Sequence, residues 1–376
     1  MVDAGPDERA RRDIVDGLTA WYRASRRDLP WRGTSDPYRV WISEAMLQQT
    51  TVKTVLGYYG RFLERFPSIA ALAAARERDV VAAWSGLGYY SRARNLHAAA
   101  RAIVERHGGV FPDDLAAVAA LPGFGPYTTG AVLSIAFGRR VPLVDGNVAR
   151  VLSRLALVRG DAKSKAVRDR LWSLAADLVA LSESPSDWNQ ALMELGALVC
   201  SPRRPSCLLC PVAILCRARL KGVEGSLPER SPRPASRPVA SAFVVARRGE
   251  KVLLVRRGDD EAVLPGLWEP PGVLFWEGAG RPDARALESA VESSHGVTLR
   301  VRDRIAEVAH SITTRRLTAG VFAGDAVPPL PRDASRVRWV APEDLGALPL
   351  SSLAKKVLRA ALDLSKAPAA PHGRRR

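Results

Sequence analysis

Cysteine and methionine are scarce in this chain, and the scarcity of cysteine is the more informative of the two. The 376 residues include 4 cysteines and 3 methionines. All the cysteines lie between Cys200 and Cys216, so none is left to crosslink the rest of the chain. A secreted fold held together by disulfides is therefore disfavoured, and reduced cysteines fit a cytoplasmic protein.

Long apolar runs are also absent. No stretch of about 18 apolar residues occurs, so the sequence predicts no membrane span and no membrane partner. The first residues, Met1 to Arg12, are charged and lack the apolar core of a signal peptide. Hydrophobic residues at 47% and charged residues at 25% are typical of a globular protein. The length predicts two or three compact units.

Positive charge, in contrast, is plentiful. The chain has 56 Lys and Arg residues against 39 Asp and Glu, for a net charge of +17. This excess favours a polyanionic partner such as nucleic acid. A compositional origin is the alternative, because the chain is rich in Ala and Arg, so charge alone favours nucleic acid only slightly. Residues 363–376 end in His372-Gly-Arg-Arg-Arg376 and are predicted to be a basic disordered tail.

Two regions of different character are predicted along the chain. Residues 1–225 are expected to be all-helical, because apolar residues recur there at helical spacing. Residues 226–238 are rich in proline, serine and charge, and are predicted to form a linker. Residues 239–362 combine short β-branched runs with two helical segments, which predicts an α+β domain. The expected strands are 239–246, 251–256, 297–301, 314–322 and 336–340.

Start signals for helices are frequent in the N-terminal region. Asp36-Pro37 combines a capping side chain with a proline at the first helical position. Asp113-Asp114 and Ser186-Asp187 are expected to cap helices in the same way. These signals support a region of many short helices.

The four cysteines are spaced C-x6-C-x2-C-x5-C, which indicates a metal site. Four thiolates can hold a [4Fe–4S] cluster or a tetrahedral zinc ion. Zinc ribbons usually show two separated Cys-x2-Cys pairs, so the spacing favours the [4Fe–4S] cluster over zinc, with disulfides the least favoured. The predicted ligands are Cys200, Cys207, Cys210 and Cys216.

A tight turn is predicted between two helical segments at residues 121–131, Leu-Pro-Gly-Phe-Gly-Pro-Tyr-Thr-Thr-Gly-Ala. Gly123 and Gly125 permit a close backbone approach, and the free N–H groups of the following helix could grip a phosphate. A plain connection between two helices is an equally good interpretation of this segment by itself.

The pattern L-P-G-x-G-x-x-T resembles the helix-hairpin-helix motif of DNA repair glycosylases, which also carry a four-cysteine iron–sulfur loop downstream. In endonuclease III-like members the position of Tyr127 holds a lysine that attacks the sugar. Tyr127 implies a monofunctional enzyme and, with the C-terminal domain, a resemblance to adenine DNA glycosylases of the MutY type. The implied fold is an all-α helix-hairpin-helix region with the cluster loop at 200–216, followed by a Nudix-like domain at 239–362.

The segment Trp41-Ile-Ser-Glu-Ala-Met-Leu-Gln-Gln-Thr50 carries a glutamate among apolar residues. A carboxyl group in an apolar pocket has a raised pKa and can act as an acid near neutral pH. A solvent-facing helical glutamate is the alternative for Glu44. The segment resembles the MutY motif S-E-x-M-L-Q-Q-T, which implies that Glu44 protonates adenine and later handles the water.

The segment Val144-Asp-Gly-Asn-Val148 offers a second carboxylate. Asp145 or Asn147 could simply cap the next helix. The segment resembles the family's D-G-N-V, which implies catalytic roles for both: Asp145 would stabilise the oxocarbenium-like sugar, with Asn147 beside it. Such glycosylases flip the target nucleotide out of the duplex first.

Further matches imply contacts to the base. Arg27-Asp-Leu-Pro-Trp-Arg32 resembles the family's R-x-L-P-W-R, so Arg27, Trp31 and Arg32 are expected to line the adenine pocket. Glu194 is expected to contact the flipped adenine, with a capping or surface glutamate as the alternative.

Other matches imply contacts to the DNA strands. Leu47, Gln48 and Gln49 are expected to lie along the strand, with Gln49 as the wedge between bases. Gly86-Leu-Gly-Tyr-Tyr-Ser91 resembles the loop that inserts a tyrosine, here Tyr89, beside the mismatched base.

The C-terminal region resembles the Nudix-like domain of MutY proteins at residues 264–272, Leu-Pro-Gly-Leu-Trp-Glu-Pro-Pro-Gly. Its helix ends Ser293-Ser-His-Gly-Val297 and lacks the glutamates that bind magnesium in Nudix hydrolases, so no nucleotide hydrolysis is predicted. The family's lesion-recognition motif F-S-H matches residues 310–315, with Ile312 as the wedge and Thr313 keeping a hydroxyl. Thr314 stands where histidine is expected, which weakens the expected discrimination between 8-oxoguanine and guanine.

The resemblance as a whole implies a DNA N-glycosylase of base excision repair. It would act as a monomer on double-stranded DNA, hydrolytically removing adenine opposite 8-oxoguanine or guanine, in the bacterial cytoplasm at the nucleoid. Two rivals stay open: a pyrimidine-lesion glycosylase with lyase activity, and an iron–sulfur DNA-binding protein without enzymatic activity.

Overall fold

The structure is a computed structural model that describes residues 7–231, 236–277, 280–312, 314–331 and 333–362. Thr313 and the predicted tail at 363–376 therefore lie outside the described residues. Contacts divide the chain into two compact units. The first comprises Met1–Val80 with Ser91–Pro232, and the second comprises Val81–Tyr90 with Arg233–Arg376.

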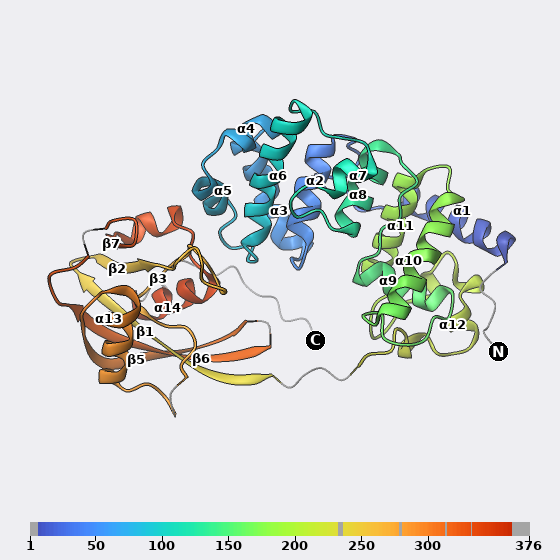
Figure 1. Ribbon diagram of the computed structural model, residues 1–376. Coiled ribbons are helices and arrows are strands. Elements are labelled where there is room, and N and C mark those ends of the chain that lie inside the picture. Colours follow the sequence, from blue (N-terminus) through green and yellow to red (C-terminus); the bar gives the residue numbers. More distant parts are fainter. Residues whose placement is uncertain (1–6, 232–235, 278–279, 313, 332, 363–376) are drawn as a thin grey trace. The chain divides into compact units, whose positions relative to one another are not determined.

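The N-terminal region is built from helices, as the sequence predicts (Figure 1). Its α-helices are α1 (Glu8–Ser25), α2 (Pro37–Leu47), α3 (Val52–Arg65), α4 (Ile69–Ala74), α5 (Glu77–Ala83), α6 (Ser91–His107), α7 (Leu115–Ala119), α8 (Pro126–Phe137), α9 (Gly146–Leu155), α10 (Lys165–Ala180), α11 (Pro185–Leu198) and α12 (Arg217–Leu220). Short 3-10 helices are η1 (Cys207–Leu209), η2 (Ala213–Leu215) and η3 (Glu224–Ser226). Among the described residues, none of the helices has the length and apolar character needed to cross a bilayer.

Capping side chains begin several of these helices. Asp36 accepts hydrogen bonds from the first turn of α2, and Asp114 does so for α7, so both predicted caps are confirmed. The cap predicted at Ser186-Asp187 is wrong. Helix α11 already begins at Pro185, so Ser186 and Asp187 lie inside its first turn. The proline occupies the start of the helix, a position that it favours.

Helix α2 is buried on nearly all sides. Its residues from Tyr38 to Met46 are buried, with the exception of Arg39. A helix that is buried all round belongs to the centre of a domain, so any polar side chain on it must find partners inside the protein. Glu44 lies on this helix.

The turn between α7 and α8 requires its first glycine. Gly123 has φ +79°, and a Cβ there would come within 2.6 Å of the Asn95 side chain. Gly125 is the N-cap of α8 and Pro126 follows it, so no side chain occupies the free N–H groups of the first turn.

The second unit is built on a mixed sheet with helices (Figure 1). Its strands are β1 (Arg237–Arg248), β2 (Lys251–Arg256), β3 (Trp268–Glu269), β4 (Gly272–Val273), β5 (Leu299–Ile312), β6 (Arg315–Ala326) and β7 (Val337–Val340). Its helices are α13 (Ala284–His295), the 3-10 helix η4 (Pro342–Ala347) and α14 (Ser352–Leu362). The strand order is β3-β2-β1-β6-β5, β4 pairs with β1, and β7 pairs with β2. The pair β1–β6 is parallel, and the other pairs are antiparallel.

Alternate residues of β1 point to opposite faces of this sheet, as a strand requires. Phe243 and Val245 belong to a core that includes Val357 of α14. Val244 and Ala246 belong to a second core that includes Val291 of α13. The two helices therefore cover different faces, and the predicted α+β character of this region is confirmed.

Strand β5 is much longer than the predicted strand at 297–301. It continues to Ile312 and pairs with β6 along its length, with register shifts between Val301 and Ala306. The charged residues 302–304, Arg-Asp-Arg, interrupt the β-branched pattern, which explains the error. Pairing with a long neighbouring strand outweighs such local preferences.

Residues Val81–Tyr90 lie within the predicted helical region but group with the second unit. The Tyr90 hydroxyl donates to the carbonyl of Leu350 at 2.7 Å, and Lys355 Nζ donates to Ser85 Oγ at 2.9 Å. The segment that contains Tyr89 is therefore held by residues of the C-terminal part of the chain.

Candidate active site and cysteine loop

A cavity of about 720 Å³ lies in the helical unit, between the 27–32 segment, α2, the α7–α8 turn, the start of α9 and α11. Most of the site residues that the sequence indicates line it. They are Arg27, Trp31, Arg32, Glu44, Leu47, Gln48, Gln49, Gly123, Gly125, Tyr127, Asp145, Asn147 and Glu194. The fold therefore brings residues from five separate segments to one place.

Glu44 and Tyr127 form the central contact of the cavity. Glu44 is 5% exposed, so it is not a solvent-facing glutamate. The Tyr127 hydroxyl donates to Glu44 Oε2 at 2.6 Å, and Met193 Sδ lies 3.3 Å from the same hydroxyl. Burial raises the pKa of Glu44, and Asp145 adds to the rise, while the Tyr127 hydrogen bond and the charge of Arg32 oppose it.

Asp145 both caps a helix and faces the cavity. Its Oδ1 accepts from the Val148 N–H at 2.7 Å at the start of α9, and Asn147 Nδ2 donates to Oδ2 at 3.4 Å. Burial raises the pKa of Asp145, and the backbone hydrogen bonds from Val148 and Asn147 oppose this rise by favouring the ionised form. The capping role predicted as an alternative is thus present, and the same side chain also lines the cavity.

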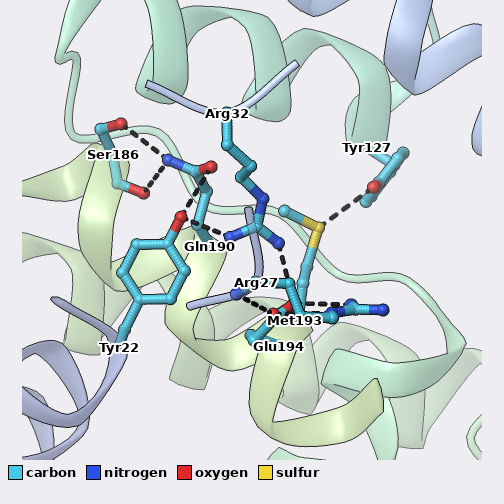
Figure 2. Close-up of polar contacts among 8 residues, drawn as sticks. All are labelled: Tyr22, Arg27, Arg32, Tyr127, Ser186, Gln190, Met193 and Glu194. Atoms are coloured by element: carbon cyan, nitrogen blue, oxygen red, sulfur yellow. Dashed lines mark hydrogen bonds and ion pairs between the residues drawn. The ribbon is translucent and has the colours of Figure 1, made fainter. Parts of the chain in front are cut away.

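Glu194 forms ion pairs with two arginines, Arg27 and Arg32 (Figure 2). Its Oε1 accepts from the backbone N–H and Nε of Arg27 at 3.1 and 2.8 Å. Its Oε2 accepts from Arg27 Nη2 at 2.7 Å and from Arg32 Nη2 at 2.9 Å. Burial acts to raise the pKa of Glu194, but these partners outweigh it, so the pKa is lowered. At 1% exposure it is not a surface residue, and the geometry favours a role in orienting the arginines over direct contact with a base.

Two residues of this network are absent from the sequence-based prediction. Gln190 lies one helical turn before Glu194 on α11 and lines the cavity. Tyr22 of α1 donates from its hydroxyl to Gln190 Oε1 at 3.0 Å, and Arg32 Nη1 donates to that hydroxyl (Figure 2). The spacing of four residues between Gln190 and Glu194 could have identified the first; nothing local identifies Tyr22.

The remaining cavity wall carries the residues predicted to meet the strand. Gln48 Nε2 donates to Thr128 Oγ1 at 3.1 Å at the start of α8. Gln49 has φ +58°, a left-handed conformation that is rare for a residue with a side chain. Trp31 is 6% exposed and packs edge-on against Tyr59. Strained backbone at Gln49 is typical of a functional segment.

The other predicted contacts lie outside this cavity. Tyr89 has φ +48° and is 57% exposed, in the segment that groups with the second unit. Residues 310–312 end β5 and Arg315 begins β6, and Ile312 pairs with Arg315. Ile312 packs against the sheet core, and Arg315 lies over the Phe275 ring at 4.2 Å. Thr313 lies outside the described residues.

The four cysteines line one small cavity together with apolar side chains of α9 and α11. The buried Arg154 of α9 donates to Cys200 Sγ at 3.2 Å, to the Ser201 carbonyl at 2.7 Å and to the Pro202 carbonyl at 2.9 Å. It thereby holds the start of the cysteine loop against α9.

Arg150, one turn before Arg154, joins the cysteine loop to the cavity. Its Nε donates to the Cys200 carbonyl at 2.8 Å, and its Nη2 donates to Asn147 Oδ1 at 2.8 Å. Within the described residues, no three His, Cys, Asp or Glu side chains are arranged to hold a single metal ion.

Comparison with known proteins gives two family matches. Residues 42–177 match the HhH-GPD superfamily base excision DNA repair protein model, and residues 241–360 match a NUDIX domain model. The human adenine DNA glycosylase is 36% identical over 399 residues, which span 91% of this chain and 72% of the human protein. The rat protein of that name is 37% identical over 92% of this chain and 78% of its own length. The Schizosaccharomyces pombe protein of that name is 29% identical over 93% and 90%.

A solved structure is also similar. A thermostable thymine-DNA glycosylase is 31% identical and has a TM-score of 0.51, covering 57% of this chain and 98% of that one. The fold and the site thus define a helix-hairpin-helix protein of base excision repair that carries a Nudix-like domain. The chain belongs to the adenine DNA glycosylase family and is a DNA N-glycosylase. The predicted family resemblance is confirmed, and the reading as a non-enzymatic binding protein is wrong.

The Glu194 network yields a stability prediction. Glu194→Gln keeps the shape but removes the charge between two arginines in a buried site, so it should lower the free energy of unfolding by roughly 2–4 kcal/mol. Asp187→Asn is the matched control, because Asp187 pairs with the exposed Arg23, and it should lower the free energy of unfolding by less than about 1 kcal/mol. Urea unfolding measures both, and equal losses would contradict the assignment.

Proposed function

We propose that this protein hydrolyses the N-glycosidic bond of adenine opposite 8-oxoguanine or guanine in double-stranded DNA, acting as a monomer without strand cleavage. The observation that carries this proposal is the contact between Glu44 and Tyr127 in a cavity that also contains Asp145. The relatives named adenine DNA glycosylase support adenine as the base.

Glu44 is proposed to act as the general acid. Loss of a purine from the sugar is favoured when the base accepts a proton, and an acid is most effective when its pKa lies near the working pH. Burial supports this role, because it raises the pKa of Glu44 and so increases its protonated fraction. Once the base has left, the same carboxylate is proposed to activate the water.

Asp145 is proposed to stabilise the positive charge that develops on the sugar. A carboxylate is most useful there when it is ionised. The two N–H donors of the α9 start favour that form, and Asn147 holds Oδ2 in position. The two carboxylates thus differ in their partners: a hydroxyl donor for Glu44 and a helix N-terminus for Asp145.

Tyr127 supports the monofunctional proposal. A Schiff base with the sugar needs an amine, and a phenol cannot form one. The Tyr127 hydroxyl is also engaged with Glu44, and burial together with Glu44 raises its pKa well above the usual range. It therefore stays protonated and donates to the acid.

The four cysteines are proposed to hold a [4Fe–4S] cluster. All four thiols line one cavity, and Arg154 donates to Cys200 Sγ there, which supports a single group bound by the four cysteines. The spacing of the cysteines favours the cluster over zinc. Bound iron would keep the thiolates ionised and hold the loop in one conformation.

Recognition of the base opposite adenine is proposed to belong to the second unit and to the segment with Tyr89. Ile312, at the end of β5, and Thr313, which lies outside the described residues, are the residues that the family motif indicates for this contact. The location in the bacterial cytoplasm stays a prediction.

The base specificity can be tested with duplexes that contain adenine opposite 8-oxoguanine, guanine, cytosine or thymine. Release of free adenine opposite 8-oxoguanine and guanine is expected, with no covalent complex trapped by borohydride. Glu44→Gln should reduce the single-turnover rate by about 100-fold or more, because the proton donor is lost. Glu64→Gln, on the exposed face of α3, is the control and should keep the rate. Release of thymine opposite guanine in place of adenine would contradict the proposal, as would full activity of Glu44→Gln.

The pH dependence tests the role of Glu44. Because the protonated form is the active acid, the rate should fall as pH rises through the raised pKa of Glu44. Tyr127→Phe removes the hydrogen bond that lowers this pKa, so the falling limb should move to higher pH. Asp145 and Arg32 also act on Glu44 and are unchanged in this variant. A limb that stays in place, or moves to lower pH, would exclude Glu44 as the acid.

The metal content tests the cluster. The purified protein should contain about four iron and four sulfide per chain. Cys210→Ser should lose most of the iron, while Ser206→Ala, a neighbour outside the ligand set, should retain it. About one zinc per chain, with no iron or sulfide, would favour the zinc alternative.

A further inference from the structure

We propose that Tyr22 is a positioning residue for base selection, because its hydroxyl sets which atom Gln190 presents to the flipped base and holds Arg32 on the cavity wall. Tyr22 is fully buried and does not line the cavity, so it acts through its two partners. The inference rests on the proposed removal of adenine.

The hydroxyl of Tyr22 has one proton, and the network decides where that proton goes. Arg32 Nη1 can only donate, so it donates to the Tyr22 oxygen. The proton of Tyr22 is therefore directed to Gln190 Oε1, at 3.0 Å (Figure 2). An oxygen, and not the NH2 group, must face Tyr22.

The NH2 group of Gln190 also has hydrogen-bond partners. Nε2 donates to the carbonyl of Ser186 at 3.3 Å and to Ser186 Oγ at 3.2 Å. The NH2 group is thus directed to Ser186, while Oε1 keeps one lone pair beyond the bond to Tyr22. Gln190 is therefore oriented to offer the flipped base an acceptor. An acceptor favours a base edge that carries an amino group and disfavours one that carries a carbonyl.

Arg32 is restrained by the same hydroxyl. Its Nη2 donates to Glu194 Oε2 at 2.9 Å, and its guanidinium lies 5.1 Å from the centre of the Tyr22 ring. Glu194 and the Tyr22 ring therefore still hold Arg32 when the hydroxyl alone is removed.

The alternative is that Tyr22 is only a core residue, since its ring belongs to the main core of the helical unit. A core residue needs the ring, whereas positioning needs the hydroxyl. Tyr22→Phe separates the two, because it keeps the ring beneath the Arg32 guanidinium and removes the hydroxyl with its bonds to Gln190 and Arg32.

The test compares single-turnover rates of Tyr22→Phe and the wild type on two duplexes with saturating enzyme. One duplex carries adenine and the other carries purine, which lacks the amino group, each opposite 8-oxoguanine. The variant should release adenine about tenfold more slowly, the effect of about one hydrogen bond, and release purine within about twofold of the wild-type rate. The preference for adenine over purine should therefore collapse.

Two further variants complete the experiment. Tyr38→Phe removes another buried hydroxyl, which donates to the Phe66 carbonyl at 2.7 Å, and should keep the preference. Ser186→Ala removes one acceptor of Gln190 Nε2 and should reduce the preference for adenine over purine by about twofold to threefold. If Tyr22→Phe does not fold, this variant tests whether the orientation of Gln190 sets the preference. An equal loss on both bases, with the preference intact, would make Tyr22 structural and overturn the inference. Failure of the wild type to release adenine would instead overturn the proposed function.

Discussion

Burial of carboxylates around one cavity is the constraint on which the rest of the site depends. Glu44 and Glu194 are almost inaccessible to solvent, and Asp145 is partly so. A buried charge is costly unless it is paired, so each carboxylate has acquired its own partners. Glu194 has two arginines and a lowered pKa, Asp145 has a helix N-terminus, and Glu44 has a single hydroxyl and a raised pKa. The difference in partners, and not in residue type, shifts the pKa values of Glu44 and Glu194 in opposite directions.

The arginines extend this arrangement through the helical unit. Arg27 and Arg32 organise the base side of the cavity through Glu194 and Tyr22. Arg150 connects Asn147 to the Cys200 carbonyl, and Arg154 binds the start of the cysteine loop. A guanidinium offers five donors in a rigid plane, so one buried side chain can fasten several carbonyls at once. Hydrogen bonds through Arg150 thereby connect the cysteine loop to the cavity, although the two contain different functional groups.

Sequence patterns predicted the elements well where local signals agreed with packing. The caps at Asp36 and Asp114, the helical region and the α+β region are examples. Prediction failed where packing overruled local preference. The Arg-Asp-Arg run does not look like a strand, but it lies in β5 because β5 pairs with β6. Helix α11 begins at a proline, before the predicted cap. Residues Val81–Tyr90 group with the second unit, and no local pattern reveals this grouping.

By itself, the sequence determined which chemistry was available: two carboxylates in recognisable motifs, a tyrosine where a lyase needs lysine, and four cysteines in one segment. These features depend on residue type and spacing, which the chain carries directly. Only the tertiary structure decided how each group is used. In the folded protein both carboxylate oxygens of Glu194 accept hydrogen bonds from arginines. Gln190 lies on the cavity wall, and the Tyr22 hydroxyl lies between Gln190 and Arg32. Hydrogen-bond partners from α1 and α11 lie more than 160 residues apart, and their contact follows from helix packing that no local pattern specifies.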